Sequence, residues 1–254
     1  MLDPKRPSLN NNAMERPNPI IVAIDTTDAE QALALAASLK GSVGAIKLGL
    51  EFFTANGAAG VRELEKAGLP IFLDLKFHDI PNTVAGAIRG LGKLNIFLTT
   101  IHTSGGAAMM QAAKEAALQL PSKPMVVGVT ILTCLDNKDM GEIGYRQEAA
   151  AQALQLAKLA KSSGLDGIVC SPHEVAAIRK ECGKDFVLVV PGIRPAGSDK
   201  GDQKRVMTPK EAMDAGASYL VIGRPITEAP DPKAAAGRIL GTLNDDQRDL
   251  SLLS

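Results

Sequence analysis

Short runs of apolar, mostly β-branched residues recur along the chain from residue 20 onward, and each run ends at a polar or glycine-rich bend. Bounded apolar runs of this length are typical of strands that are buried on both faces. We therefore predict eight strands, over residues 20–24, 44–49, 70–76, 96–102, 124–132, 166–170, 185–190 and 218–223.

Alanine-rich stretches with a helical pattern lie between the predicted strands. Residues 28–40 read DAEQALALAASLK, and residues 146–164 read RQEAAAQALQLAKLAKSSG, which ends at Gly164, a common helix stop. Strands that alternate with helices pair in parallel through right-handed crossovers. Eight such units in about 235 residues predict a (β/α)8 TIM barrel, an α/β fold of one domain.

A doubly wound open sheet is the main alternative to the barrel. Such sheets usually carry a GxGxxG turn after the first strand, whereas this chain reads DTTDAE there. We assign the barrel domain to residues 20–254. Residues 1–19 hold four prolines and four asparagines without an apolar stretch, so we expect a disordered lead-in rather than a secretory signal.

Composition and charge exclude several classes of protein. The chain has 28 Lys+Arg and 28 Asp+Glu, which gives no electrostatic reason to expect nucleic acid or an anionic membrane as a partner. No apolar run approaches the roughly 20 residues of a membrane helix. Cys134, Cys170 and Cys182 lack the spacing of a zinc site and are odd in number, so we expect a reducing, cytoplasmic setting.

Charged residues fall where the first three predicted strands end. Asp25 follows the first strand, Lys47 lies near the end of the second, and Asp74 and Lys76 end the third. The i, i+2 spacing places Asp74 and Lys76 on one face, at the end of the barrel where catalysis takes place. A buried salt bridge that only closes the barrel is the alternative, but four converging charges favour a functional site.

Two polar residues end the next strands. His102 closes the fourth strand and Thr133 follows the fifth. We interpret His102 as hydrogen-bonding support for the site rather than as a reacting group. His78 and His173 lack partners at metal-ligand spacing, so no metal site is predicted.

The loops after the seventh and eighth strands fit a phosphate site. Residues 191–209 read PGIRPAGSDKGDQKRVMTP, and residues 222–227 read IGRPIT. In this fold these two loops usually bind phosphate through backbone N–H groups and an arginine. The candidates are Gly192, Arg194, Gly223 and Arg224. Solvated loops with ordinary turn glycines are the alternative.

The residues alone therefore predict a barrel enzyme that acts on a small phosphorylated molecule. A lysine flanked by carboxylates is a natural proton donor, because the acids favour its ammonium form and hold it in place. This pattern points to proton transfer at carbon and does not identify the reaction.

Longer sequence blocks resemble one family, the bacterial orotidine 5′-phosphate decarboxylases. FLDLKFHDIPNTV closely resembles that family's signature, and the likeness continues in family order through AIKLGLEFF, HTSGG, VVGVTILT, GLDGIVCSPHE, the loop at 191–209 and YLVIGRPIT. The resemblance implies conversion of orotidine 5′-monophosphate to UMP and CO2, the last step of de novo UMP synthesis. It also implies a homodimer with shared active sites and no metal or organic cofactor.

The resemblance also assigns roles by motif. Lys76 would protonate C6 of the pyrimidine, Asp74 would lie beside the substrate carboxylate, and Asp79 would help to hold Lys76. Lys47, Asp74 and Lys76 would come from one subunit, and Asp79 with Thr83 from the other.

The remaining implied contacts are with the substrate. Asp25 and Lys47 would contact the ribose. Thr133 and Arg194 would belong to the pyrimidine side and the closing loop, and the phosphate would be bound by Gln203, Gly223 and Arg224.

Two other functions remain as alternatives. Mg²⁺-dependent sugar-phosphate decarboxylases and aldolases of the same superfamily also carry a DxK strand, but HDIPNT and the loop at 191–209 argue against them. A barrel that only binds nucleotides is the second alternative, and the intact Asp74, Lys76 and Asp79 argue against it.

Overall fold

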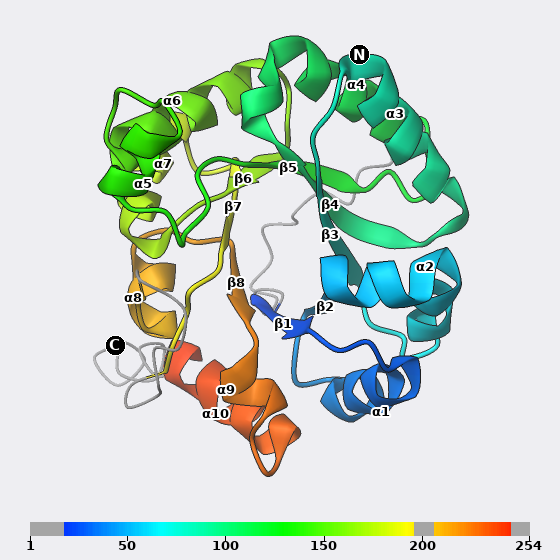
Figure 1. The fold of residues 1–254 in the computed structure, drawn as a ribbon. Coiled ribbons are helices and arrows are strands. Elements are labelled where there is room, and N and C mark those ends of the chain that lie inside the picture. Colours follow the sequence, from blue (N-terminus) through cyan, green and yellow to red (C-terminus); the bar gives the residue numbers. More distant parts are fainter. Residues whose placement is uncertain (1–17, 196–205, 245–254) are drawn as a thin grey trace, which may run out of the picture.

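The eight apolar runs form eight parallel strands that pair in chain order around a closed barrel (Figure 1). The structure is a computed structural model that describes residues 18–195 and 206–244. The strands are β1 (Ile20–Ile24), β2 (Ala45–Leu48), β3 (Ile71–Phe77), β4 (Ile96–His102), β5 (Met125–Val129), β6 (Gly167–Val169), β7 (Val187–Val190) and β8 (Tyr219–Ile222). The predicted (β/α)8 barrel is confirmed.

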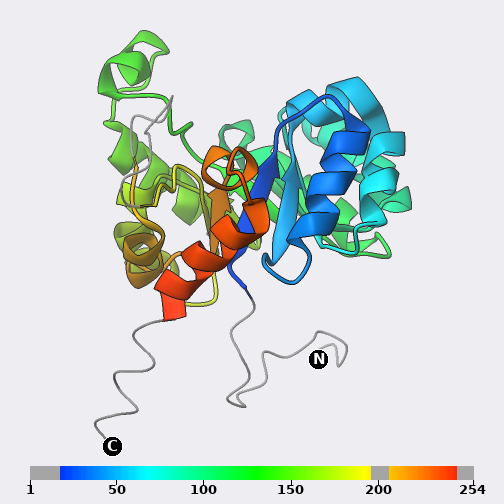
Figure 2. The same ribbon diagram turned by 90° about the horizontal axis from the view of Figure 1, so that it is seen from below.

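Helices follow the strands and surround the barrel (Figure 1). They are α1 (Ala29–Leu39), α2 (Leu50–Glu65), α3 (Pro81–Gly90), α4 (Gly106–Leu118), α5 (Asn137–Glu142), α6 (Ala149–Ser162), α7 (Val175–Cys182), α8 (Pro209–Asp214), α9 (Arg224–Thr227) and α10 (Pro232–Asn244). Short 3-10 turns, η1 (Leu91–Lys93), η2 (Thr103–Gly105) and η3 (Pro172–Glu174), interrupt the connections. The last helix, α10, packs between α8 and α1 and so completes the helical ring (Figure 2).

The barrel closes between the first and last strands. Ile20 of β1 is in register with Leu220 of β8, and the backbone N–H of Leu220 donates to the carbonyl of Pro19 at 2.9 Å. Asn18 donates its side-chain amide to the carbonyl of Ser42 at 2.9 Å. Contacts with the barrel therefore begin inside the predicted lead-in, whose residues 1–17 lie outside the described part of the chain.

Two apolar layers follow from the alternation of side chains along each strand. In β1, Ile20, Val22 and Ile24 pack against the helices, whereas Ile21 and Ala23 point into the barrel. The interior layer consists of Ile21, Ala23, Ala45, Phe72, Leu98, Val127, Val189 and Val221. Buried side chains thus fill the barrel, as is usual for this fold, and leave polar chemistry to its ends.

The pairing of β3 with β4 is irregular at the carboxyl end. Leu73 pairs with Thr99 and Phe77 with Ile101, so three residues of β3 lie opposite Thr100 alone. Within this bulge, Lys76 has a φ of 50°, a left-handed backbone conformation that residues with a Cβ atom rarely adopt. Such a residue costs on the order of 1–3 kcal/mol, which the surrounding structure must offset.

Paired charges hold the opposite, amino-terminal end of the barrel. Asp166, just before β6, accepts Lys114 Nζ at 2.7 Å through Oδ1 and at 2.6 Å through Oδ2. The same Oδ2 accepts the backbone N–H of Val126 at 2.8 Å. Lys114 of α4 is thereby joined to the starts of two strands.

Arg179 of α7 performs a similar task beside β7 and β8. Its guanidinium donates to the carbonyl of Phe186 at 2.6 Å, to the carbonyl of Gly216 at 2.7 and 2.9 Å, and to Ser218 Oγ at 3.0 Å. Because these acceptors precede the two strands, one side chain fixes how both strands enter the barrel.

Among the described helices, none is long and apolar enough to cross a membrane.

Candidate active site

The polar site continues the inward-facing positions of the first three strands beyond the apolar layer. Asp25 is two residues after the interior Ala23, Lys47 two after Ala45, and Asp74 two after Phe72. Side chains at i and i+2 share a strand face, so alternation alone carries these charges to the barrel axis at the carboxyl end.

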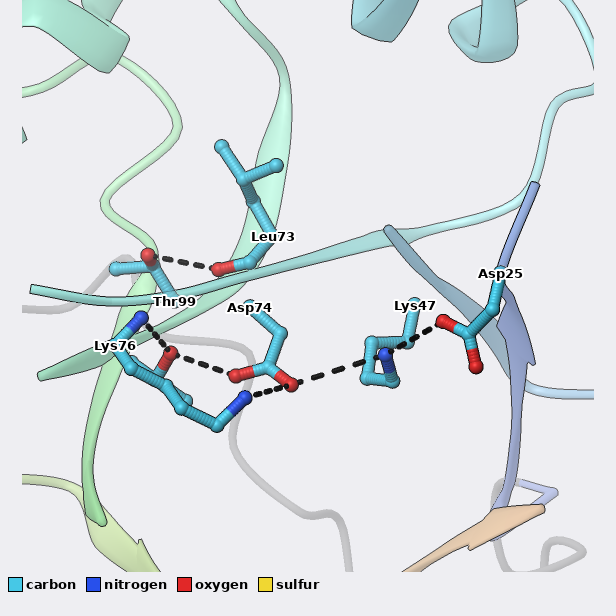
Figure 3. A network of polar contacts seen from close by, with 7 residues as sticks. Asp25, Lys47, Leu73, Asp74, Lys76 and Thr99 are labelled. Carbon is cyan, nitrogen blue, oxygen red and sulfur yellow. Dashed lines mark hydrogen bonds and ion pairs between the residues drawn. The ribbon is translucent and has the colours of Figure 1, made fainter. Parts of the chain in front are cut away.

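The predicted charges do converge (Figure 3). Lys76 Nζ lies 2.8 Å from Asp74 Oδ2, and Lys47 Nζ lies 3.8 Å from the same oxygen. Lys47 Nζ is also 3.3 Å from Asp25 Oδ1. Two ammonium groups therefore share one carboxylate oxygen, and Asp25, Lys47, Asp74 and Lys76 form one chain of alternating charge.

The four charged side chains differ in their exposure to solvent: the two in the middle of the row are mostly buried, and the two at its ends are more exposed. The side chains of Asp74 and Lys47 are 10% and 12% exposed, whereas those of Lys76 and Asp25 are 29% and 57% exposed. The central pair is screened little by solvent, so its charges act strongly on nearby groups. A ligand in the barrel mouth can reach Lys76 and Asp25 directly.

Thr100 is a site residue that the sequence did not reveal. Its Oγ1 donates to Asp74 Oδ1 at 2.9 Å and accepts the backbone N–H of Lys76 at 2.9 Å. Thr100 is fully buried and shares its strand face with the interior Leu98. Two threonines in an apolar strand are ordinary, because β-branched residues favour strands, and nothing else in the sequence distinguishes Thr100.

His102 was expected to support the charged site through a hydrogen bond, but its contact in the structure is of another kind. Its ring lies 5.4 Å from the ring of His78, centroid to centroid, and within the described part of the chain it has this ring contact instead of the predicted hydrogen bond. Burial lowers the pKa of His102 below its ordinary value of 6.5. His78 and Lys76 lower the pKa further, whereas Asp74 opposes the shift.

Asp79 and Thr83 do not join the charged chain within the described residues. Both side chains are exposed, one in the turn after β3 and the other in the first turn of α3. Asp79 Oδ1 accepts the backbone N–H of its neighbour Ile80 at 2.6 Å. Ile80 is 66% exposed, which makes the turn both apolar and acidic on its outer side.

The candidate phosphate and pyrimidine residues surround the same mouth. Thr133 is half-buried in the segment between β5 and α5, and Arg194 follows β7. Gly223 follows β8, and the exposed Arg224 opens α9. Gln203 falls outside the described residues, so its predicted role is neither supported nor opposed by the structure.

Backbone hydrogen bonds fix the position of Arg194. Its N–H donates to the carbonyl of Met207 at 3.0 Å, and the N–H of Met207 donates to the carbonyl of Gly192 at 3.4 Å. Gly192 has a φ of 74°, which favours glycine at that position. The φ of Gly223, in contrast, is −105° and does not favour glycine. A Cβ added there would lie 3.6 Å from Ala23 Cβ, which is an ordinary contact distance.

Within residues 18–195 and 206–244, no group of three or more His, Cys, Asp or Glu side chains is arranged to hold a metal ion. The site is thus a chain of lysines and carboxylates with arginines at its rim. Such an arrangement can bind an anionic ligand and supply a proton to it from an ammonium group.

Comparison with known proteins gives consistent matches over most of the chain. A family model described as "Orotidine 5'-phosphate decarboxylase / HUMPS family" matches residues 18–239. The curated orotidine 5′-phosphate decarboxylase of Paramagnetospirillum magneticum is 56% identical over 231 residues, covering 89% of this chain and 98% of the relative. The enzyme of the same name from Moorella thermoacetica is 52% identical over 233 residues, covering 89% of this chain and 92% of the relative.

Solved structures agree with these matches. The crystal structure of orotidine 5′-phosphate decarboxylase from Lactobacillus acidophilus superposes with a TM-score of 0.79 at 42% identity, covering 89% of this chain and 99% of that one. The corresponding structure from Pyrococcus horikoshii OT3 gives a TM-score of 0.71 at 25% identity, with the same coverage of both chains.

Proposed function

The chain belongs to the orotidine 5′-phosphate decarboxylase / HUMPS family, and we propose that it converts orotidine 5′-monophosphate to UMP and CO2 in pyrimidine biosynthesis. The family description alone covers two kinds of enzyme, but four relatives at 50–56% identity are each named as the decarboxylase. The observation that carries the proposal is the chain of Asp25, Lys47, Asp74 and Lys76, whose ammonium and carboxylate groups alternate at the barrel mouth.

Lys76 is the proton donor in this proposal. Loss of CO2 leaves a carbanion at C6 of the pyrimidine, and an ammonium held beside that carbon both stabilises the developing charge and protonates it. Asp74 supports this role because its Oδ2 lies 2.8 Å from Lys76 Nζ and holds that group in place.

Asp74 also lies beside the carboxylate that the substrate loses. Two like charges about 4 Å apart at an effective dielectric near 20 repel by about 4 kcal/mol. Expressed fully in the barrier, that repulsion would supply about a thousandfold acceleration. The slowest reactions that enzymes catalyse need far more, so the preorganised Lys76 cation contributes the larger part.

The rest of the substrate is bound away from the reacting carbon. Asp25 and Lys47 contact the ribose, Thr133 and Arg194 the pyrimidine side, and Gln203, Gly223 and Arg224 the phosphate. Phosphate binding at this distance offsets the cost of orienting and desolvating the reacting end.

We further propose a cytoplasmic homodimer that needs no metal or organic cofactor. In this dimer, Asp79 and Thr83 of each subunit complete the partner's site, and Asp79 helps to hold the partner's Lys76. The exposure of both side chains, together with the exposed Ile80 between them, supports this arrangement. A reducing setting fits the three cysteines, which form no disulfide within the described residues, with Cys170 and Cys182 buried.

A turnover assay with EDTA tests the function most directly. Purified protein should consume orotidine 5′-monophosphate, followed by the loss of its absorbance, and should release UMP at the same rate with and without EDTA. No turnover of orotidine 5′-monophosphate, together with Mg²⁺-dependent turnover of a sugar phosphate, would instead favour the sugar-phosphate enzymes of the family, because those depend on the metal. Tight binding without any turnover would favour a nucleotide-binding barrel.

Mixed dimers test the shared site. Lys76→Ala and Asp79→Ala chains should each be nearly inactive alone. Random assortment of equal amounts makes half of the dimers mixed, and each mixed dimer holds one site with both intact residues. The co-expressed mixture should therefore recover about a quarter of wild-type activity, and two different affinity tags confirm that mixed dimers have formed. Confirmed mixed dimers that stay as inactive as their parents would place Asp79 in its own subunit's site.

A further inference from the structure

Thr100 contacts both the lysine and the aspartate at the centre of the charged site. Its single hydroxyl contacts the backbone of Lys76 and the carboxylate of Asp74, each at 2.9 Å. We propose that Thr100 is a positioning residue for the reaction, which fixes Lys76 and Asp74 relative to each other. This inference rests on the decarboxylase function proposed above.

The first contact stabilises an uncommon backbone conformation. The bulge opposite Thr100 removes the N–H of Lys76 from regular pairing with β4, and Lys76 has a φ of 50° there. An unpaired N–H in a buried strand is costly, so the Thr100 hydroxyl that accepts it makes this conformation tolerable. The conformation in turn sets the direction in which the Lys76 side chain leaves the strand.

The second contact follows from the first. A hydroxyl has one proton to donate, and an oxygen that accepts an N–H directs that proton elsewhere. The proton goes to Asp74 Oδ1, which leaves Oδ2 to face the two ammonium groups of Lys76 and Lys47. Rotation of the Asp74 carboxylate would break this hydrogen bond, so Thr100 keeps Oδ2 turned toward Lys76.

Burial and side-chain type make Thr100 suited to this task. It is fully buried, so water does not compete for its hydroxyl. A β-branched side chain also has few accessible χ1 rotamers, which holds the oxygen in place. Thr100 thus acts only through Asp74 and Lys76, the two residues that its hydroxyl contacts.

A matched set of variants tests the proposal. Thr100→Val keeps the shape and removes the hydroxyl, whereas Thr100→Ser keeps the hydroxyl. Thr99→Val is the control, because Thr99 is also fully buried in β4 but donates only to the backbone carbonyl of Leu73, at 2.9 Å. Figure 3 shows this separate contact beside the charged chain.

We expect Thr100→Val to lower kcat by about a hundredfold, the size of effect that a shift of roughly 1 Å at a reacting group produces. Binding of UMP, measured by titration calorimetry, should stay within about threefold of wild type, because most contacts with UMP lie elsewhere. Thr100→Ser should recover most of kcat, and Thr99→Val should retain it.

Three outcomes would overturn the proposal: Thr100→Val turning over like Thr99→Val, Thr100→Ser being as impaired as Thr100→Val, or loss of kcat with an equal loss of UMP affinity. If Thr100→Val does not fold, Thr100→Ala against Thr99→Ala decides the same question. The wild-type enzyme is assayed in each series, and its failure to release UMP would reject the proposed function and not the positioning role.

Discussion

The two ends of the barrel use buried charge in opposite ways. At the amino-terminal end, Asp166 receives Lys114 through both oxygens at 2.6 and 2.7 Å and also binds a strand N–H. At the carboxyl end, two ammonium groups compete for one oxygen of Asp74, at 2.8 and 3.8 Å. The first pair is short and well satisfied, whereas the second group is crowded and adjoins a strained backbone.

The difference shows which end was shaped by stability. A buried ion pair contributes to stability only when its geometry and hydrogen bonds compensate for lost hydration. Asp166 and Lys114 meet that condition. The charges at the carboxyl end meet it less well and lie where barrel enzymes bind their substrates, which fits the ligand-binding role proposed above. Removing a lysine from each end should therefore give opposite results.

The largest effect is expected for Lys76→Ala at the carboxyl end. Decarboxylation should fall by about four orders of magnitude or more, because the variant loses the proposed proton donor and the cation proposed to lie beside the carbanion. Thermal stability and UMP binding should change little, since Asp74 keeps Thr100 and Lys47 as neighbours. Single-turnover kinetics and calorimetry measure both quantities, and a variant that keeps a tenth of the wild-type rate would remove Lys76 from this role.

A smaller and opposite effect is expected for Lys114→Ala at the amino-terminal end. The mostly buried Asp166 carboxylate then loses its neutralising ammonium, so the free energy of unfolding should fall by about 3 kcal/mol. Lys138→Ala is the control, because Lys138 forms an exposed pair with Glu142, worth less than about 1 kcal/mol. Urea unfolding measures these changes.

Activity separates the two ends further. Folded Lys114→Ala protein should decarboxylate at the wild-type rate, because Lys114 pairs with Asp166 at the end of the barrel opposite the charged site. A loss of kcat in fully folded protein would mean that the two ends are coupled.

The smallest effect concerns His102 and pH. Because its pKa is lowered in the folded protein, the unfolded chain binds a proton more readily as the pH falls below 6.5. The stability associated with neutral His102 is therefore complete above pH 6.5 and is lost as the pH falls through the lowered value. Unfolding curves across this range should show a steeper loss for wild type than for His102→Phe, which keeps a ring against His78. Equal slopes would contradict the assignment.

The strands were predictable from the sequence to within a few residues. The first apolar run, 20–24, forms β1 with the same bounds, and the run at 96–102 forms β4. The run at 124–132 was predicted too long, because β5 ends at Val129 and the chain turns into the segment before α5. Apolar residues continue through Ile131 there because that segment builds a small core of its own with Met140 and Leu156.

The charged site was predictable only in part. Alternation along the strands placed Asp25, Lys47, Asp74 and Lys76 together, and the structure confirms their convergence. The bulge that gives Lys76 a positive φ could not be predicted, because the apolar and polar residues of β3 alternate through it without interruption. Leu75 and Phe77 still pack toward the helices. The role of Thr100 depends on that bulge, so no residue pattern could have revealed it.

Closure of the barrel between β1 and β8 has a consequence during protein synthesis. Ile20 leaves the ribosome about 200 residues before its partner Leu220. At typical bacterial and eukaryotic elongation rates of roughly 5 to 20 residues per second, this interval lasts on the order of ten to forty seconds. Throughout it, one edge of β1 has hydrogen-bonding groups without a strand beside them, which is the condition under which nascent chains aggregate. Until β8 is made, β2 is the one neighbour with which β1 can form its native pairing within the described barrel.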